Sequence, residues 1–105
     1  MEINKNTGKT ITLEEAVSFT HSFQSENINE IKSFFVGSET LKKILTQEGC
    51  IGLRIYNGYD ASANKSNRVL VGVDEMGEDI SDGVIVDYLE PCPIFCPNSS
   101  PLIRN

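Results

Sequence analysis

The sequence predicts an α+β fold: three short N-terminal helices packed on a three- to four-stranded antiparallel sheet, followed by a C-terminal strap rich in proline and cysteine. Up to Gly49 the apolar residues recur at helical spacing between capping signals. From Cys50 onward they alternate with polar residues, as in half-buried strands. Helices first and strands after is the order typical of an α+β domain.

The first predicted helix covers about 13–24. Thr12 directly precedes this helix and Glu15 lies in its first turn. The pair has the pattern of a capping box, in which each side chain bonds the other residue's amide. Apolar residues at helical spacing predict a second helix over 28–36 and a third over 39–48, each ending at a glycine. Because all three are short, they depend on packing for stability.

The strands are predicted from alternation. The segment "CIGLRIYNG" predicts a first strand from residue 50, "RVLVGVD" a second over 68–74 and "VIVDYL" a third over 84–89. The polar residues 57–67 predict a loop between the first two strands, and the two glycines of "DEMGEDISDG" predict turns before the third.

A chain of 105 residues is most simply one domain, residues 1–105. It divides into an extended N-terminus (1–11), the helical part (12–49), the sheet (50–90) and the strap (91–105). The predicted core consists of Leu13, Val17, Phe23, Ile31, Phe34, Leu41, Ile44, Leu45, Ile51, Leu53, Ile55, Val69, Val71, Val73, Val84 and Val86, with Ile94, Phe95 and Leu102 of the strap packing inward.

The charge is uneven. The net charge is −6, yet residues 1–68 are neutral, with eight acidic and eight basic side chains. Seven acidic residues and Arg104 alone follow. Such a surface repels phosphate backbones and argues against nucleic-acid binding, whereas it suits a basic protein partner, a divalent cation or plain solubility. No apolar run is long enough to span a membrane and no secretory signal opens the chain, so we expect a soluble cytoplasmic protein.

The strap carries the thiols. Cys92 and Cys96 lie at C-x3-C spacing, which differs from the usual C-x2-C of zinc and thioredoxin-like sites. In a reducing compartment two free thiols are the first expectation, and a disulfide would be transient. A zinc site would recruit Cys50 and His21, the other cysteine and the sole histidine. Each thiol also precedes a proline, as in haem-responsive Cys-Pro motifs. We therefore expect no cofactor, with zinc as the alternative.

The acidic segment offers oxygen ligands of the kind that calcium prefers. It does not follow the EF-hand pattern, because the sixth position from Asp74 is Asp79 where the turn needs glycine. An irregular cation site remains a hypothesis, with Asp74, Glu78, Asp79 and Asp82 as its candidate ligands.

Catalytic motifs are missing from the sequence. It contains no nucleophile elbow, no Walker loop and no dinucleotide-binding glycine pattern. Asp74 and Asp87, at predicted strand ends, are the least arbitrary carboxylate pair, but a solvated surface crowded with acids explains such a pair better. We expect a protein that is not an enzyme.

The remaining possibility is that the protein binds a partner through one face of the predicted sheet. If the three aliphatic stripes all face the helices, then Arg54, Tyr56, Arg68 and Tyr88 share the opposite face, and Tyr59 adds an aromatic side chain beside the loop. Arginine and tyrosine are enriched at the centres of protein interfaces. An antiparallel sheet also shows such residues to solvent in the ordinary case.

The segments "CIGLRIYNG" and "VLVGVDEMGEDISDGVIVDYLEPCP", the second strap cysteine and the closing "PL" resemble a group of small uncharacterised bacterial proteins over residues 50–102. The resemblance implies a compact domain that includes the strap, and no activity comes with it.

These observations predict a non-enzymatic, acidic interaction module, such as an adaptor, an inhibitor of the immunity type or an assembly subunit. The expected partner is another protein, and the acidic charge favours a basic one. Self-association into a homo-oligomer is a further possibility. The alternative function is a metal- or redox-responsive module that uses Cys50, Cys92 and Cys96.

Overall fold

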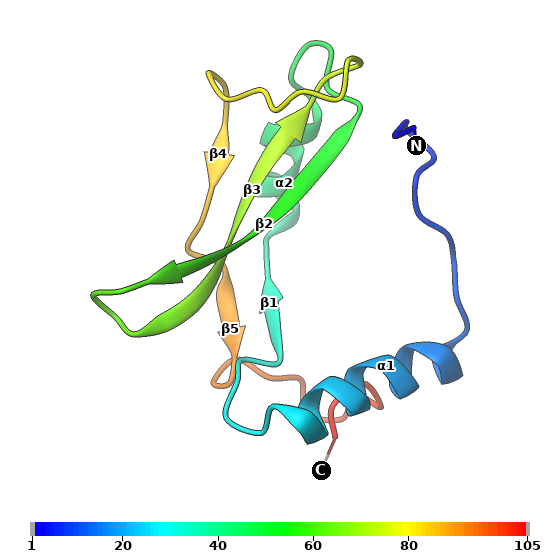
Figure 1. Ribbon diagram of the computed structural model, residues 1–105, viewed down its shortest axis with the longest axis vertical. Coiled ribbons are helices and arrows are strands. Elements are labelled where there is room, and N and C mark those ends of the chain that lie inside the picture. Colours follow the sequence, from blue (N-terminus) through cyan, green and yellow to red (C-terminus); the bar gives the residue numbers. More distant parts are fainter. Residues whose placement is uncertain (1, 105) are drawn as a thin grey trace. The chain divides into compact units, whose positions relative to one another are not determined.

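The computed structural model describes residues 2–104. Over these residues it is an α+β structure with two helices and two antiparallel sheets (Figure 1). The chain forms two compact units, of which the first joins residues 2–7 to residues 35–89 and the second joins residues 8–34 to residues 90–104.

The first unit is built on a long hairpin. Strands β2 (Gly52–Asp60) and β3 (Lys65–Val73) pair antiparallel along their whole length, from Gly52 opposite Val73 to Asp60 opposite Lys65. The short β4 (Ile85–Val86) pairs antiparallel with the other side of β3, which gives the strand order β2-β3-β4. Strand β2 is therefore an edge strand.

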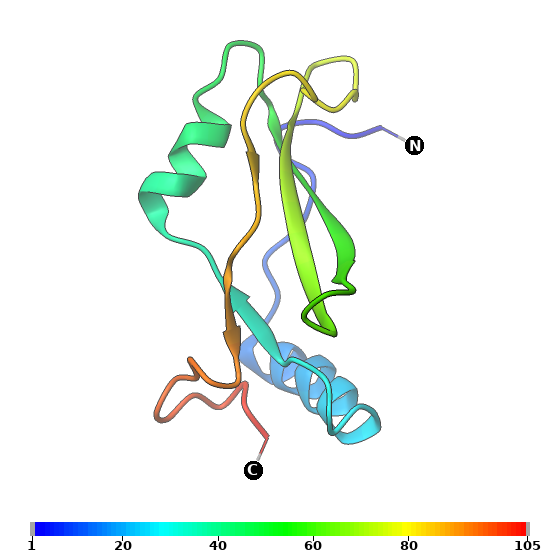
Figure 2. The ribbon, with the colours of Figure 1, turned by 90° about the vertical axis from the view of Figure 1, so that its left-hand side faces the viewer.

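Helix α2 (Ser38–Leu45) covers one face of this sheet near its Gly72 end (Figure 2). Ile44 is fully buried there. A Cβ atom added to Gly72 would lie 3.4 Å from Cγ2 of Ile44 and 2.9 Å from Nε2 of Gln47, so a larger residue would press on the helix and on the glutamine that follows it. The side chain of Gln47 also accepts a hydrogen bond from the Val84 amide at 2.8 Å, which ties the end of the helix to the segment before β4.

The second unit begins with α1 (Leu13–Glu26). The predicted capping box is confirmed, since Glu15 N–H donates to Oγ1 of Thr12 and Thr12 N–H donates to Oε1 of Glu15. Strands β1 (Ser33–Phe35) and β5 (Glu90–Cys92) form the second sheet, and the adjoining Lys32 amide donates to the Cys92 carbonyl at 2.7 Å.

The strap is held to α1 by one buried amide side chain. Gln24 is 5% exposed; its Nε2 donates to the Leu102 carbonyl at 3.0 Å and its Oε1 accepts from the Arg104 amide at 2.7 Å. Nε2 of His21, on the same helix, lies 2.9 Å from the Pro101 carbonyl. The expectation that the strap belongs to the fold is consistent with these bonds.

Four predicted elements differ from the structure. The third helix, predicted over 39–48, ends at Leu45, four residues before Gly49. The second helix is wrong: its place holds a turn and the strand β1, whose pairing partner β5 follows much later in the chain. The predicted loop over 57–67 shrinks to the turn at 61–64, because both strands continue through the polar segment. The third strand is shorter than predicted and contains only Ile85–Val86.

The predicted core is confirmed at Ile44, Val71 and Val73. Four predicted core residues are instead largely exposed, namely Leu13, Phe23, Leu45 and Ile55. In the strap Leu102 is half-buried, but Ile94 and Phe95 are exposed and do not pack inward. Leu70, which alternation assigned to the outer face, is buried.

Candidate interaction site

The pairing register decides which side chains share a face of the hairpin. Residues directly opposite in an antiparallel pair lie on the same face. Arg54 is opposite Val71 and Tyr56 is opposite Val69, so the arginine and tyrosine share the face of the β3 valines. Gly72, on the other face, is the residue next to α2. Arg54 and Tyr56 thus lie on the face away from α2.

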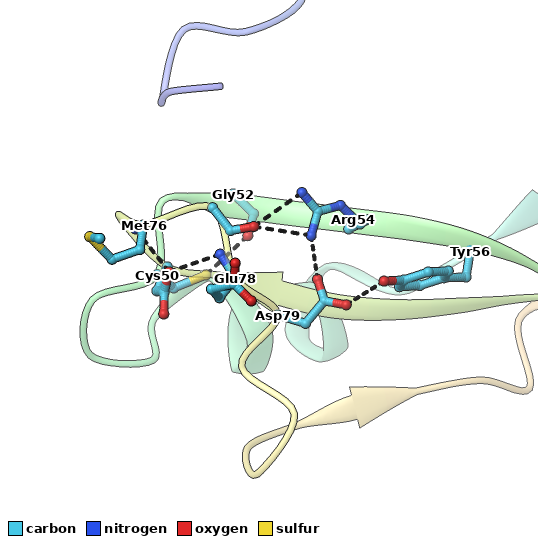
Figure 3. A network of polar contacts seen from close by, with 9 residues as sticks. Cys50, Gly52, Arg54, Tyr56, Met76, Glu78 and Asp79 are labelled. Atoms are coloured by element: carbon cyan, nitrogen blue, oxygen red, sulfur yellow. Dashed lines mark hydrogen bonds and ion pairs between the residues drawn. The ribbon is translucent and has the colours of Figure 1, made fainter. Parts of the chain in front are cut away.

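A carboxylate joins these two side chains. Nη1 of Arg54 donates to Oδ1 of Asp79 at 2.5 Å, and the hydroxyl of Tyr56 donates to Oδ2 of the same residue (Figure 3). The guanidinium also lies 3.4 Å from the carbonyl oxygen of Gly77 through both Nη1 and Nη2. Asp79 itself bridges to Val73, which places it beside the end of β3. We call Arg54, Tyr56 and Asp79 the Arg-Asp-Tyr network.

The network holds the segment that we call the acidic turn, residues 74–82. Within this turn Oδ1 of Asp74 accepts from the amides of Met76 and Glu78, at 2.9 Å and 3.0 Å. The Asp74 amide donates in return to the Glu78 carbonyl at 2.9 Å. Gly77 takes a φ of 83°, in the left-handed region that favours glycine. The turn is therefore fixed both from inside and from β2.

The network shifts the pKa of each member away from neutrality. The hydrogen bond from Tyr56 lowers the pKa of Asp79 most, and Arg54 lowers it further against the opposing effect of desolvation. The hydrogen bond to Asp79 raises the pKa of Tyr56, with desolvation acting in the same direction. Near pH 7 the carboxylate stays ionised and the phenol stays protonated. General acid–base catalysis needs groups that titrate near the working pH, so this pattern fits a structural network better than a catalytic one.

The other carboxylates of the acidic turn point to solvent. Glu75, Glu78 and Asp82 are exposed and make no ion pair among the residues that the structure describes. Met76 lies between Glu75 and Glu78 in the sequence and is 83% exposed. The turn thus presents three unneutralised charges and one exposed apolar side chain.

The predicted interaction residues do not form one face. The predicted common face required all three aliphatic stripes to point to the helices, but the register puts the β2 and β3 stripes on opposite faces. Arg68 lies opposite Asn57 and so away from Arg54. The hydroxyl of Tyr59 donates to Oδ1 of Asn64 at 2.7 Å within the hairpin turn, and Tyr88 is 92% exposed.

The strap cysteines are joined by a disulfide. Cys92 and Cys96 are bonded to each other with their Cα atoms 4.7 Å apart, so the expectation of two free thiols is wrong for this structure. Cys50 is a free, half-buried thiol whose Sγ lies 3.1 Å from the Gly52 carbonyl. The ring of His21 contacts the strap backbone. The structure therefore does not show the four candidate zinc ligands as a set.

The candidate cation ligands have separate structural tasks. Asp74 bonds the turn amides and Asp79 bonds Arg54 and Tyr56, whereas Glu78 and Asp82 face solvent. Across residues 2–104, no group of three or more His, Cys, Asp or Glu side chains is arranged to hold a metal ion.

Residues 2–7 lie near the start of β2 and enclose an open pocket of about 400 Å³. The pocket is lined by Ile3, Lys5 and the β2 segment from Gly52 to Ile55, among others. Ile3 also approaches Gly77, where an added Cβ would lie 3.6 Å from its Cδ1. The N-terminal segment therefore supports the acidic turn as well.

The sequence alone did not connect Arg54 to Asp79. The arginine was assigned to a surface and the aspartate to a cation site. The signal that joins them is the register: Arg54 lies opposite Val71, and Asp79 pairs with Val73 on the other side of β3, so the arginine side chain reaches the carboxylate across β3. Gln24 and Gln47 were also missed, because the sequence gives no sign of which distant backbone groups an amide side chain will bond.

Searches against family models, curated proteins and solved structures found no match to this chain. Among the described residues, no helix has the length and apolar character that a membrane crossing requires.

Proposed function

We propose that the protein is a non-enzymatic interaction module that binds a basic protein through the acidic turn. The observation that carries the proposal is the attachment of this turn to β2 by the Arg-Asp-Tyr network. A loop that is already ordered loses less conformational entropy when a partner binds. The internal bonds of Asp74 add to the same order.

Charge selects the kind of partner. Arg54 pairs with Asp79 alone, so Glu75, Glu78 and Asp82 keep their charge for an external cation. Basic side chains of a partner would bond these carboxylates, and exposed Met76 on the same turn would supply an apolar contact. Complementary charge of this kind raises the association rate and selects against acidic partners.

The test is affinity retention from an extract of the source cells on the immobilised protein, with proteins eluted by salt and identified by mass spectrometry. We expect a basic protein to be retained and then released as ionic strength rises. The test variant carries Glu75→Gln, Glu78→Gln and Asp82→Asn, and should retain much less of this protein.

The matched control removes the same charge elsewhere, through Glu14→Gln, Glu26→Gln and Glu30→Gln, all exposed positions outside the turn. It should retain the basic protein as the wild type does. Equal loss of retained basic protein in both variants would mean that binding depends on net charge and not on the acidic turn, which would contradict the proposal. Retention of no basic protein at all would also contradict it.

The disulfide supports a second candidate function, a redox-responsive module. Cys92 is fully buried in β5, and its carbonyl accepts the Lys32 amide next to β1. An external dithiol would reduce the Cys92–Cys96 bond to two thiols and become a disulfide itself, so the exchange balances in protons and electrons. Reduction would then release a constraint at one end of the β1–β5 pair.

Hydrogen exchange in oxidised and reduced protein tests this second candidate. We expect the Lys32 amide to exchange faster after reduction, and Cys50→Ser, which leaves the bonded pair intact, to behave as the wild type does. Identical exchange in the two redox states would make the disulfide a structural staple only.

A further inference from the structure

Among the residues that the structure describes, no strand lies on the outer edge of β2. In the order β2-β3-β4 this strand pairs with β3 on its other edge. Residues 2–7 lie near its first half, but within the described chain no backbone hydrogen bond joins them to β2. A nine-residue edge with free backbone groups is a template for another strand.

The side chains of β2 include none of the usual residues that block pairing at an edge strand. Proteins commonly block edge strands with lysine, proline or a bulge, and the segment "GLRIYNGYD" contains neither lysine nor proline. Ile55 and Tyr59 lie on the same face of the strand and are 60% and 62% exposed. They flank Asn57 symmetrically, one two residues before it and the other two residues after it.

We propose that β2 pairs antiparallel with β2 of a second copy about a two-fold axis through Asn57. Both sheets then join into one continuous sheet. In this register Ile55 of each copy faces Tyr59 of the other, and Arg54 faces Asp60. Tyr56 lies opposite Gly58 of the second copy, while its hydroxyl keeps its bond to Asp79.

Charge and shape select this register. Moving the axis to Tyr56 sets Arg54 against Gly58, and moving it to Gly58 sets Arg54 against Ser62, so only the axis at Asn57 forms two Arg–Asp pairs. A shift of the pairing by one residue would bring opposite faces together. Pairs of apolar and of oppositely charged side chains are the ones that stabilise neighbouring antiparallel strands.

The charged groups have capacity for this contact. The three hydrogen bonds that Asp60 accepts, from Ser62 and Ala63, all end on Oδ1. Arg54 uses Nη1 and Nη2 for Asp79 and Gly77. Oδ2 of Asp60 accepts none of these three bonds and is open to a donor of the second copy. Arg54 would lie opposite Asp60 as the complementary charge while its guanidinium stays on Asp79.

Sedimentation equilibrium of the wild-type protein tests the association itself. We expect a monomer–dimer equilibrium with mass rising toward twice the chain mass as concentration increases. Asp60→Lys, which sets a lysine against Arg54 of the second copy, should shift the equilibrium to monomer. The matched control is Glu30→Lys, the same charge change at an exposed position outside β2, and it should dimerise as the wild type does. A monomer at every concentration would overturn the proposal.

Disulfide trapping tests the register in the background of Cys50→Ser. Residues opposite each other at the two-fold axis have Cα atoms close enough for a disulfide. Under copper-phenanthroline oxidation, with oxygen accepting the electrons, Asn57→Cys should form covalent dimers about tenfold faster than Tyr59→Cys, which faces Ile55. A mixture of Ile55→Cys and Tyr59→Cys proteins should form the mixed dimer. Equal rates for Asn57→Cys and Tyr59→Cys, or no mixed dimer, would overturn this register.

Discussion

Arg54 and Asp79 lie 25 positions apart in the sequence and 2.5 Å apart in the structure, measured from Nη1 to Oδ1. Their contact joins the edge strand of the hairpin to the turn that follows β3. The turn thereby acquires a fixed position on the sheet, and its remaining carboxylates face solvent. The stability of the protein should therefore depend on this contact and on the packing around it.

Asp79→Asn should lower the melting temperature at neutral pH, because the variant lacks the charge that bonds both Arg54 and Tyr56. The pKa of Asp79 is lowered in the folded protein, so its contribution is fully present above the unfolded-state pKa and is lost as pH falls through the folded-state pKa. The difference between wild type and variant should thus be constant near neutrality and shrink below about pH 4. Thermal unfolding followed by circular dichroism measures it, and a difference that does not depend on pH would contradict the assignment.

Tyr56→Phe should show the opposite dependence. The pKa of Tyr56 is raised in the folded protein, mainly by its bond to Asp79, so its contribution is present below the unfolded-state pKa and lost as pH rises through the folded-state pKa. The wild type should be the more stable protein at pH 7 and lose this advantage above about pH 10. Tyr59→Phe serves as the control, since that hydroxyl bonds an asparagine and not a carboxylate.

Arg54 and Tyr56 are not free surface side chains, because both bond Asp79. If Arg54 and Tyr56 were free surface residues, as the alternation suggested, replacing both by alanine would leave stability unchanged. Because they hold the acidic turn, we expect the double alanine variant to lose both stability and partner binding.

Gly72→Ala should destabilise the protein by about 1–3 kcal/mol, the usual cost of inserting a group into a closely packed core. The added Cβ would meet Gln47 at 2.9 Å, Cys50 at 3.1 Å and Ile44 at 3.4 Å. Gly52→Ala is the control in the neighbouring strand, because an added Cβ there meets nothing within 4 Å. Urea denaturation measures both, and equal stabilities would mean that α2 does not pack on Gly72.

Removing the disulfide with Cys92→Ser and Cys96→Ser should cost about 2 kcal/mol, the loop-closure value for so short a loop. Burial of Cys92 confines the new hydroxyl to an apolar site, so Cys92→Ala with Cys96→Ala is the cleaner variant for separating the bond from polarity. A stability that matches reduced wild-type protein is expected for the alanine pair.

The sequence predicted the local features well. The capping box of α1 and the start of α2 near Ser38 depend on neighbouring residues, and both are present in the structure. The hairpin strands were also found, because alternation is a local signal. Their length was underestimated, since polar residues 57–67 look like a loop until cross-strand pairing stabilises them as strand.

The predictions that were wrong concern features that depend on residues distant in the sequence. The segment that forms β1 is too short for helix and strand periodicity to be distinguished, and its partner β5 lies in the proline-rich strap. The face assignment failed because each strand's alternation was correct by itself, whereas the register between the strands was unknown. A change of register by one residue moves every side chain of a strand to the opposite face. The actual register places Arg68 and Arg54 on opposite faces, and it places Arg54 on the face from which it reaches the acidic turn.

Hydrogen exchange of the turn amides tests most directly that the Arg-Asp-Tyr network fixes the acidic turn. The amides of Asp74 and Ile80 donate to the carbonyls of Glu78 and Gly72, at 2.9 Å and 2.8 Å. The account predicts that Asp79→Asn makes both exchange faster while the amide of Leu41, which bonds Gly37 at the start of α2, exchanges as in the wild type. Unchanged exchange at Asp74 and Ile80 would contradict the account, because the turn would then hold its shape without the network.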